Sequence, residues 1–123
     1  MKRSIPVLSL LLALTLTGCY NDSREDLYPI ASCDTSDITY TGFIAPLMRQ
    51  SCATSTCHDN ATASLNIVLD NYAGVLEIAL NGKMTGALTH AAGFYPMPKN
   101  APRLDDCTLL RVQKWIDAGA PEN

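Results

Sequence analysis

Two cysteines and a histidine form the segment of this chain best suited to chemistry. They stand in the run CATSTCH at residues 52–58, where four residues separate Cys52 from Cys57 and His58 follows directly. Covalent haem attachment uses this combination, because two thiols bond the two vinyl groups and the adjacent imidazole reaches the iron. The usual spacer has two residues, so the pattern alone leaves open a small disulfide loop with an exposed histidine.

Two other uses of these cysteines need partners that the chain supplies poorly. A zinc site requires a third and a fourth ligand, and the remaining soft candidates, His90 and Cys107, match no zinc-finger spacing. A cysteine nucleophile requires an activating base that a third group orients, and nothing near His58 in the sequence supplies that group. Haem attachment and a disulfide therefore remain the two interpretations to be compared.

A haem iron bound by the protein on both faces would need a second donor, and Met97 is the best candidate. It stands between two prolines, 39 residues after the histidine of the motif. Proline fixes φ, and Pro98 disfavours the helical conformation for Met97, so its thioether should point in a defined direction. His90 is the alternative ligand. Met48 and Met84 fall within helical patterns, and we expect both to pack there.

The first 18 residues are typical of an export signal. A positive start is followed by a twelve-residue apolar run, Ile5 to Leu16, which is shorter than the roughly 20 residues that cross a bilayer. The run ends in LTGC at residues 16–19, which resembles the lipobox of bacterial lipoproteins. That resemblance makes Cys19 the acylated mature N-terminus and predicts a lipid-anchored protein of the cell envelope, with its domain in the periplasm or at the cell surface. The alternative is an ordinary secreted protein with Cys19 in a disulfide.

Residues 19–36 are polar and acidic and are predicted to form a tether, which leaves one domain over residues 37–123. Assigning Cys19 to lipid leaves four cysteines for an oxidising compartment. Either Cys33 pairs with Cys107 and the other two bind haem, or the four form two disulfides without a cofactor. Residues 19–123 hold 7 basic and 12 acidic residues, so the acidic domain is not expected to bind nucleic acid.

Hydrophobic periodicity predicts an all-α domain of four or five short helices. The first is expected within residues 39–50, beginning no earlier than about Gly42 because Pro46 belongs in a first turn. The second covers residues 70–80, with Leu80 on its apolar face, and a short third helix covers residues 84–91. The last begins at Asp105 or Asp106 and ends near residue 118. Residues 65–69 are ambiguous and could form a strand.

Five sequence features in this order resemble the small c-type cytochromes, and most closely the planctomycete-type cytochrome c domains of bacterial lipoproteins. They are FIAPLM at 43–48, CH at 57–58, LNIVLDNY at 65–72, MP at 97–98 and WIDAGA at 115–120. The resemblance spans residues 38–120. It implies a cytochrome c-like fold, with the terminal helices packed together around one covalent haem c per chain, and this packing would bring Cys33 near Cys107.

The resemblance also implies the role of each site residue. Cys52 and Cys57 would form the thioethers, His58 would be the proximal iron ligand and Met97 the distal one. The function that we expect is electron transfer to and from redox partner proteins, by a membrane-anchored carrier or a subunit of a larger oxidoreductase that is not an enzyme by itself. Two alternatives stay open: a haem catalyst or ligand sensor with a labile sixth ligand, and a haem-free, disulfide-stapled binding or structural lipoprotein.

Overall fold

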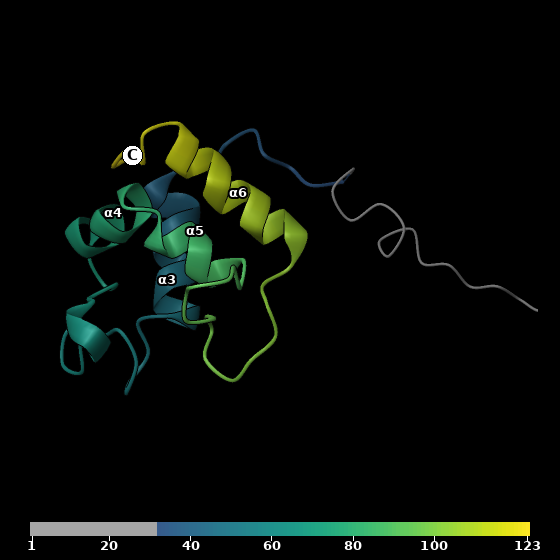
Figure 1. Ribbon diagram of the computed structural model, residues 1–123. Coiled ribbons are helices and arrows are strands. Elements are labelled where there is room, and N and C mark those ends of the chain that lie inside the picture. The colour runs from purple at the N-terminus through teal and green to yellow at the C-terminus, as the bar shows by residue number, and fades with distance from the viewer. Residues whose placement is uncertain (1–31) are drawn as a thin grey trace, which may run out of the picture.

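The computed structural model describes residues 32–123, which contain helices and no strand (Figure 1). This confirms the all-α prediction for these residues. The elements in chain order are the π-helix η1 (Tyr40–Ile44), α3 (Ala45–Ser51), the 3-10 turn η2 (Ser64–Asn66), α4 (Tyr72–Leu80), α5 (Lys83–Leu88) and α6 (Asp106–Asp117). The expected signal segment and Cys19 lie outside the described residues.

The first helix begins two residues before the predicted Gly42. Thr39 is its cap, because its extended backbone places the side-chain oxygen 3.0 Å from the amide of Gly42. The first turn is a π-turn, in which the Ala45 amide donates to the Tyr40 carbonyl five residues earlier. Ordinary α-helix follows from Ala45, with Pro46 in its first turn, where a missing N–H group costs little.

Helices α4 (Tyr72–Leu80) and α5 (Lys83–Leu88) are both shorter than predicted, and α4 also buries a different face. Asn71 caps α4 by accepting a 3.0 Å hydrogen bond from the Gly74 amide. Val75 and Ala79 form the buried face of α4, whereas Leu80 at its end is 62% exposed. Helix α5 begins after Gly82 and ends at Leu88, three residues before the predicted end. The ambiguous residues 65–69 include part of η2 and form no strand.

The last helix agrees with its prediction to within one residue at each end. Asp105 caps α6 through both carboxylate oxygens, one on the Thr108 amide at 2.9 Å and one on its hydroxyl at 2.6 Å. These hydrogen bonds to the ionised form lower the pKa of Asp105. Beyond the helix, Gly119 adopts a left-handed φ of 91°, and Trp115 donates its indole N–H to the carbonyl of Pro121.

The four α-helices within residues 32–123 share one hydrophobic core. In Figure 1, α6 crosses one end of the molecule, while α3 and α5 run beneath it. The largest fully buried side chains are Trp115 of α6, Ile44 and Met48 of the first helix, and Val75 of α4. Tyr40 packs edge-on to Tyr72 at 5.0 Å between ring centroids, so the aromatic contacts connect the first helix to α4 as well as to α6.

A disulfide connects Cys33 to Cys107, with 5.4 Å between their Cα atoms, inside the range that such bonds require. It attaches the segment before the first helix to the first turn of α6. The pairing of Cys33 with Cys107, which both sequence-based accounts allow, is present in the structure. The bridge closes a loop that contains most of the described residues, including the whole CATSTCH segment.

Candidate functional site

The four-residue spacer between the two motif cysteines folds into a closed loop at the end of α3. Cys52 and Ala53 are both bonded to the helix, because their amides donate to the Met48 carbonyl at 2.9 and 2.7 Å. The amide of His58 then donates back to the Cys52 carbonyl at 3.1 Å, and the Cys57 amide donates to Thr54 at 3.0 Å. The extra spacer residues are therefore absorbed within the loop, which keeps His58 beside Cys52.

The outer edge of this loop depends on a left-handed residue. Thr56 has a φ of 72°, and its amide donates to the side-chain oxygen of Thr62 at 3.2 Å. The following segment returns to the loop, since the Ser64 amide donates to the Cys57 carbonyl at 3.0 Å. Small polar side chains that satisfy backbone groups explain why a longer spacer can still have a defined shape.

Cys52 and Cys57 are free thiols, and both are partly buried. Burial first, and then the neighbouring Cys57, raise the pKa of the Cys52 thiol to about 11. This shift disfavours the thiolate that a nucleophilic cysteine requires. The second disulfide of the haem-free interpretation is not formed in this structure.

His58 is the buried member of the motif, with 8% of its surface exposed. Its Nδ1 atom lies 3.1 Å from the carbonyl oxygen of Ile67. A carbonyl can only accept, so Nδ1 is the donor, and in the neutral form of the ring the lone pair is then on Nε2. Metal-binding histidines are commonly oriented in this way, by a backbone carbonyl on the ring nitrogen that does not bind the metal.

The carbonyl partner is a feature that the sequence analysis missed. Ile67 supplies a backbone atom, so no side-chain type at that position could have indicated the role. The backbone also holds the two segments together, because the Leu69 amide donates to the His58 carbonyl at 2.8 Å. His58 is thus fixed at its ring and at its main chain by the residues that lead into α4.

Met97 lies in the loop between α5 and α6, partly buried against the hydrophobic core. Its amide donates to the Ala87 carbonyl at 3.0 Å, and its bond to Pro98 is cis. Met48 and Met84 are 1% and 2% exposed in that core, so the expectation that they pack inside helices is confirmed. Among the three methionines within residues 32–123, Met97 is the one held in a loop by a backbone contact to a neighbouring helix.

His90 is exposed and directed at the same loop. Its Nε2 atom lies 3.1 Å from the carbonyl oxygen of Met97. This contact uses Nε2, the ring nitrogen that lies farthest from the backbone. His90, which was the alternative to Met97 as the iron ligand, therefore contacts the main chain of Met97.

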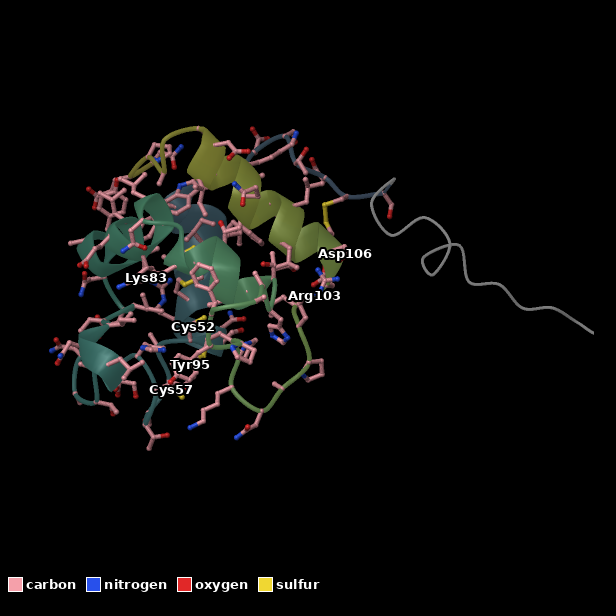
Figure 2. All side chains as sticks on the ribbon, viewed as in Figure 1. Cys52, Cys57, Lys83, Tyr95, Arg103 and Asp106 are labelled. Atoms are coloured by element: carbon pink, nitrogen blue, oxygen red, sulfur yellow. A yellow bond between two sulfur atoms is a disulfide. The ribbon has the colours of Figure 1, made fainter. Side chains whose placement is uncertain are left out.

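The predicted site residues thus fall into two groups. Cys52, Cys57 and His58 form one group in the loop after α3, and His90 joins Met97 in the other. Cys52 and Met97 both pack against the single core. Figure 2 labels Cys52 and Cys57 of the first group and Tyr95 of the methionine loop, whose side chain is 78% exposed.

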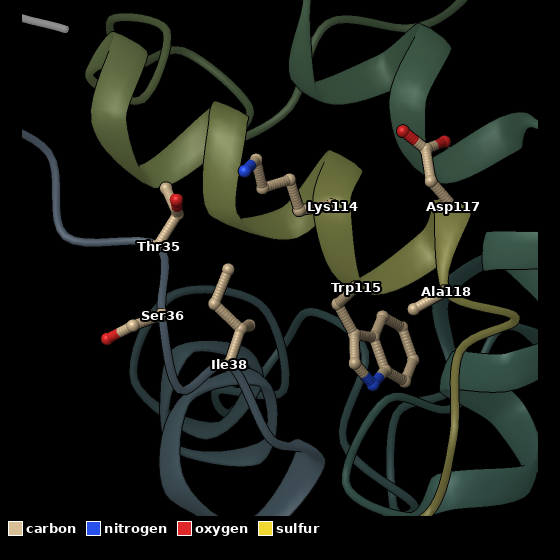
Figure 3. Close-up of a pocket in the computed structure, with 7 residues that line it drawn as sticks. All are labelled: Thr35, Ser36, Ile38, Lys114, Trp115, Asp117 and Ala118. Carbon is tan, nitrogen blue, oxygen red and sulfur yellow. The ribbon is translucent and has the colours of Figure 1, made fainter.

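An open surface hollow of about 330 Å³ lies elsewhere, between residues 35–38 and α6 (Figure 3). It is lined by Thr35, Ser36, Ile38, Lys114, Trp115, Asp117 and Ala118. None of the predicted site residues contributes to it, so its position gives no information about the chemistry of the cysteine loop.

Comparisons with known proteins leave the site to be interpreted from its own geometry. Within residues 32–123, no helix has the length and apolar character to cross a bilayer, and no cluster of three or more histidine, cysteine or acidic side chains could hold a metal ion by itself. No protein-family model, no curated protein and no solved structure matches this chain.

Proposed function

We propose that this protein binds one covalent haem c and transfers electrons while anchored to a bacterial membrane by lipid on Cys19. The observation that carries the proposal is the orientation of His58. Its Nδ1 atom is engaged by the Ile67 carbonyl, which leaves Nε2 as the ring nitrogen for a metal, in the same loop as two free thiols. A thiol pair with an oriented neutral imidazole is the donor set that haem c attachment requires.

The residues fit the cofactor by their chemistry. Cys52 and Cys57 would hold the vinyl groups as thioethers, and both are available because neither is in a disulfide. His58 would bind the iron through Nε2, and Met97 would bind its other face through the thioether. When bound, haem supplies a one-electron cycle between ferric and ferrous iron.

The chain's own contribution is to fix ligands and exclude others. The Ile67 carbonyl orients the His58 ring. The contact of the Met97 amide with Ala87 limits movement of the distal loop. With both His58 and Met97 as ligands, no coordination position on the iron would be open, which favours an electron carrier over an enzyme. A methionine and histidine pair gives a higher reduction potential than two histidines.

The haem-free lipoprotein is the second candidate, and one observation favours it. Residues 32–123 already form a core with a disulfide across it, so the fold has an internal source of stability without a cofactor. On this interpretation Cys52 and Cys57 would pair with each other outside the cell interior, where free thiols rarely persist.

Extraction distinguishes the two candidates. The protein is produced in a bacterium that contains the machinery for c-type haem attachment, and its haem is extracted with acidified acetone. We expect the colour to stay with the protein and the pyridine haemochrome to have the position of a haem with two saturated vinyl groups.

Cys52→Ser and Cys57→Ser are the matched variants for this assay. Each should shift the haemochrome toward that of a haem with one thioether. If wild-type protein loses all colour to the acetone phase, the proposed function is wrong.

A further inference from the structure

Helix α5 ends in a motif that normally contains glycine. The Ala91 amide donates to the Gly86 carbonyl at 3.0 Å, and the His90 amide donates to the Ala87 carbonyl at 3.3 Å. These two hydrogen bonds define a Schellman motif, in which the residue after the cap is left-handed and is usually glycine. Here that residue is His90, with a φ of 55°.

The same chain ends α6 in the usual way. There the Ala120 amide donates to Trp115 at 3.0 Å and the Gly119 amide donates to Ile116 at 2.9 Å. The left-handed residue is Gly119, with a φ of 91°. A side chain at such a position is unfavourable because its Cβ approaches the following carbonyl. The histidine at the end of α5 therefore bears a backbone strain that a glycine would avoid, and strain of this kind is concentrated at functional sites.

From this position the histidine side chain makes a hydrogen bond to the methionine loop. Because a carbonyl oxygen only accepts, Nε2 of His90 donates its proton to Met97 across 3.1 Å. The Met97 amide donates to Ala87, in the last turn of the same helix. The main-chain N–H and C=O groups of Met97 are therefore both held by the end of α5.

The intervening loop is held against the same helix. A Cβ atom built on Gly86 would lie 2.6 Å from the ring of Phe94. The ring therefore packs directly on the glycine backbone, between the His90 turn and Met97. The loop has little freedom to carry Met97 away from α5 while the contact from His90 is present.

We propose that His90 is a positioning residue for Met97, which holds its carbonyl in place so that the thioether would remain available to the haem iron as the distal ligand. The inference rests on the proposed function, since it concerns the distal ligand of that same site. In this role His90 is not itself an iron ligand, but acts through its hydrogen bond to the main chain of the proposed ligand, Met97.

Two variants distinguish the effect of the His90 hydrogen bond from the effect of the left-handed backbone at residue 90. His90→Gly removes the donor and relieves the left-handed strain, whereas His90→Gln keeps an N–H donor at a similar reach and keeps the strain. The measurement is the apparent affinity of ferric holoprotein for added imidazole, which can bind only in the fraction of molecules whose methionine has dissociated. Loss of one hydrogen bond should raise that affinity roughly 2- to 12-fold in His90→Gly, and His90→Gln should stay near the wild type.

Each outcome separates this inference from the proposed function. The expected pattern is tighter imidazole binding in His90→Gly, with haem content unchanged and the sulfur-to-iron charge-transfer band weakened. Equal affinity in all three proteins, or an equal rise in both variants, would overturn the positioning role while the haem function stands. Wild-type protein without covalent haem would overturn the proposed function and the inference with it.

Discussion

Removal of the Cys33–Cys107 disulfide should destabilise the protein without changing its chemistry. The bond joins residues 74 positions apart, so reducing it frees a loop of about 75 residues in the unfolded chain. The chain-entropy relation gives about 4 kcal/mol for a loop of that length at 25 °C. For a domain of this size, that loss corresponds to a fall in melting temperature of roughly 15–30 °C.

The double variant Cys33→Ser/Cys107→Ser is the appropriate perturbation, because a single variant would leave one unpaired thiol able to form a disulfide with a second protein molecule. Urea unfolding followed by far-ultraviolet circular dichroism gives the free energy of unfolding for each protein. Wild-type protein treated with a reductant is the matched control, and it should lose a similar amount since the same loop opens. The haem spectrum should be unchanged in all samples, because the bridge lies outside the motif.

A double variant within about 1 kcal/mol of the wild type would refute the loop-entropy reasoning. It would mean that the disulfide does not restrict the unfolded chain as the loop length predicts. Loss of haem from the double variant would contradict the account in a different way, because it would give Cys33 or Cys107 a part in attachment.

Three further predictions concern the helix packing, the buried thiol and the distal ligand. Gly74→Ala should destabilise the protein by about 1–3 kcal/mol in urea unfolding, because the new Cβ would lie 1.8 Å from the Val68 carbonyl oxygen; a gain in stability, as helix propensity alone predicts, would contradict the packing. In haem-free protein the raised pKa of Cys52, about 11 in place of 9.0, makes a contribution to the stability of the fold that is fully present below pH 9. This contribution, at most about 3 kcal/mol, should disappear as the pH rises from 9 to 11; Cys52→Ala should lack that part of the pH dependence, and identical profiles would refute the burial effect. Met97→Ala should abolish the sulfur-to-iron charge-transfer band and lower the reduction potential, whereas an unchanged spectrum would assign the distal ligand elsewhere, with His90 next.

The helix ends show how far the sequence determines the fold. The prediction of Asp105 or Asp106 as the cap placed the start of α6 correctly, and Gly119 placed its end, since both residue types have strong local preferences. The end of α5 was placed three residues late, because His90 occupies a left-handed position that sequence patterns assign to glycine. The exception to the local rule is the residue that contacts the Met97 loop.

The candidate site was predictable to a similar degree. The sequence motif identified Cys52, Cys57 and His58, and the structure keeps these neighbours together in one hydrogen-bonded loop. The partner of the His58 ring is a backbone carbonyl, and a backbone group cannot be predicted from the residue type at that position. The early start of the first helix was missed for a related reason: Thr39 caps a π-turn, and residue spacing based on an α-helix does not include that register.

The most direct test of the central claim is the mass of one tryptic peptide. Trypsin should release residues 50–83, since Arg49 and Lys83 bound a stretch without other basic residues. This peptide contains Cys52, Cys57 and His58 and no other cysteine. After denaturation, the account predicts that the peptide carries the added mass of one haem, and that the Cys52→Ser/Cys57→Ser double variant does not. A wild-type peptide with the mass of the chain alone, or of the chain less two hydrogens, would contradict it.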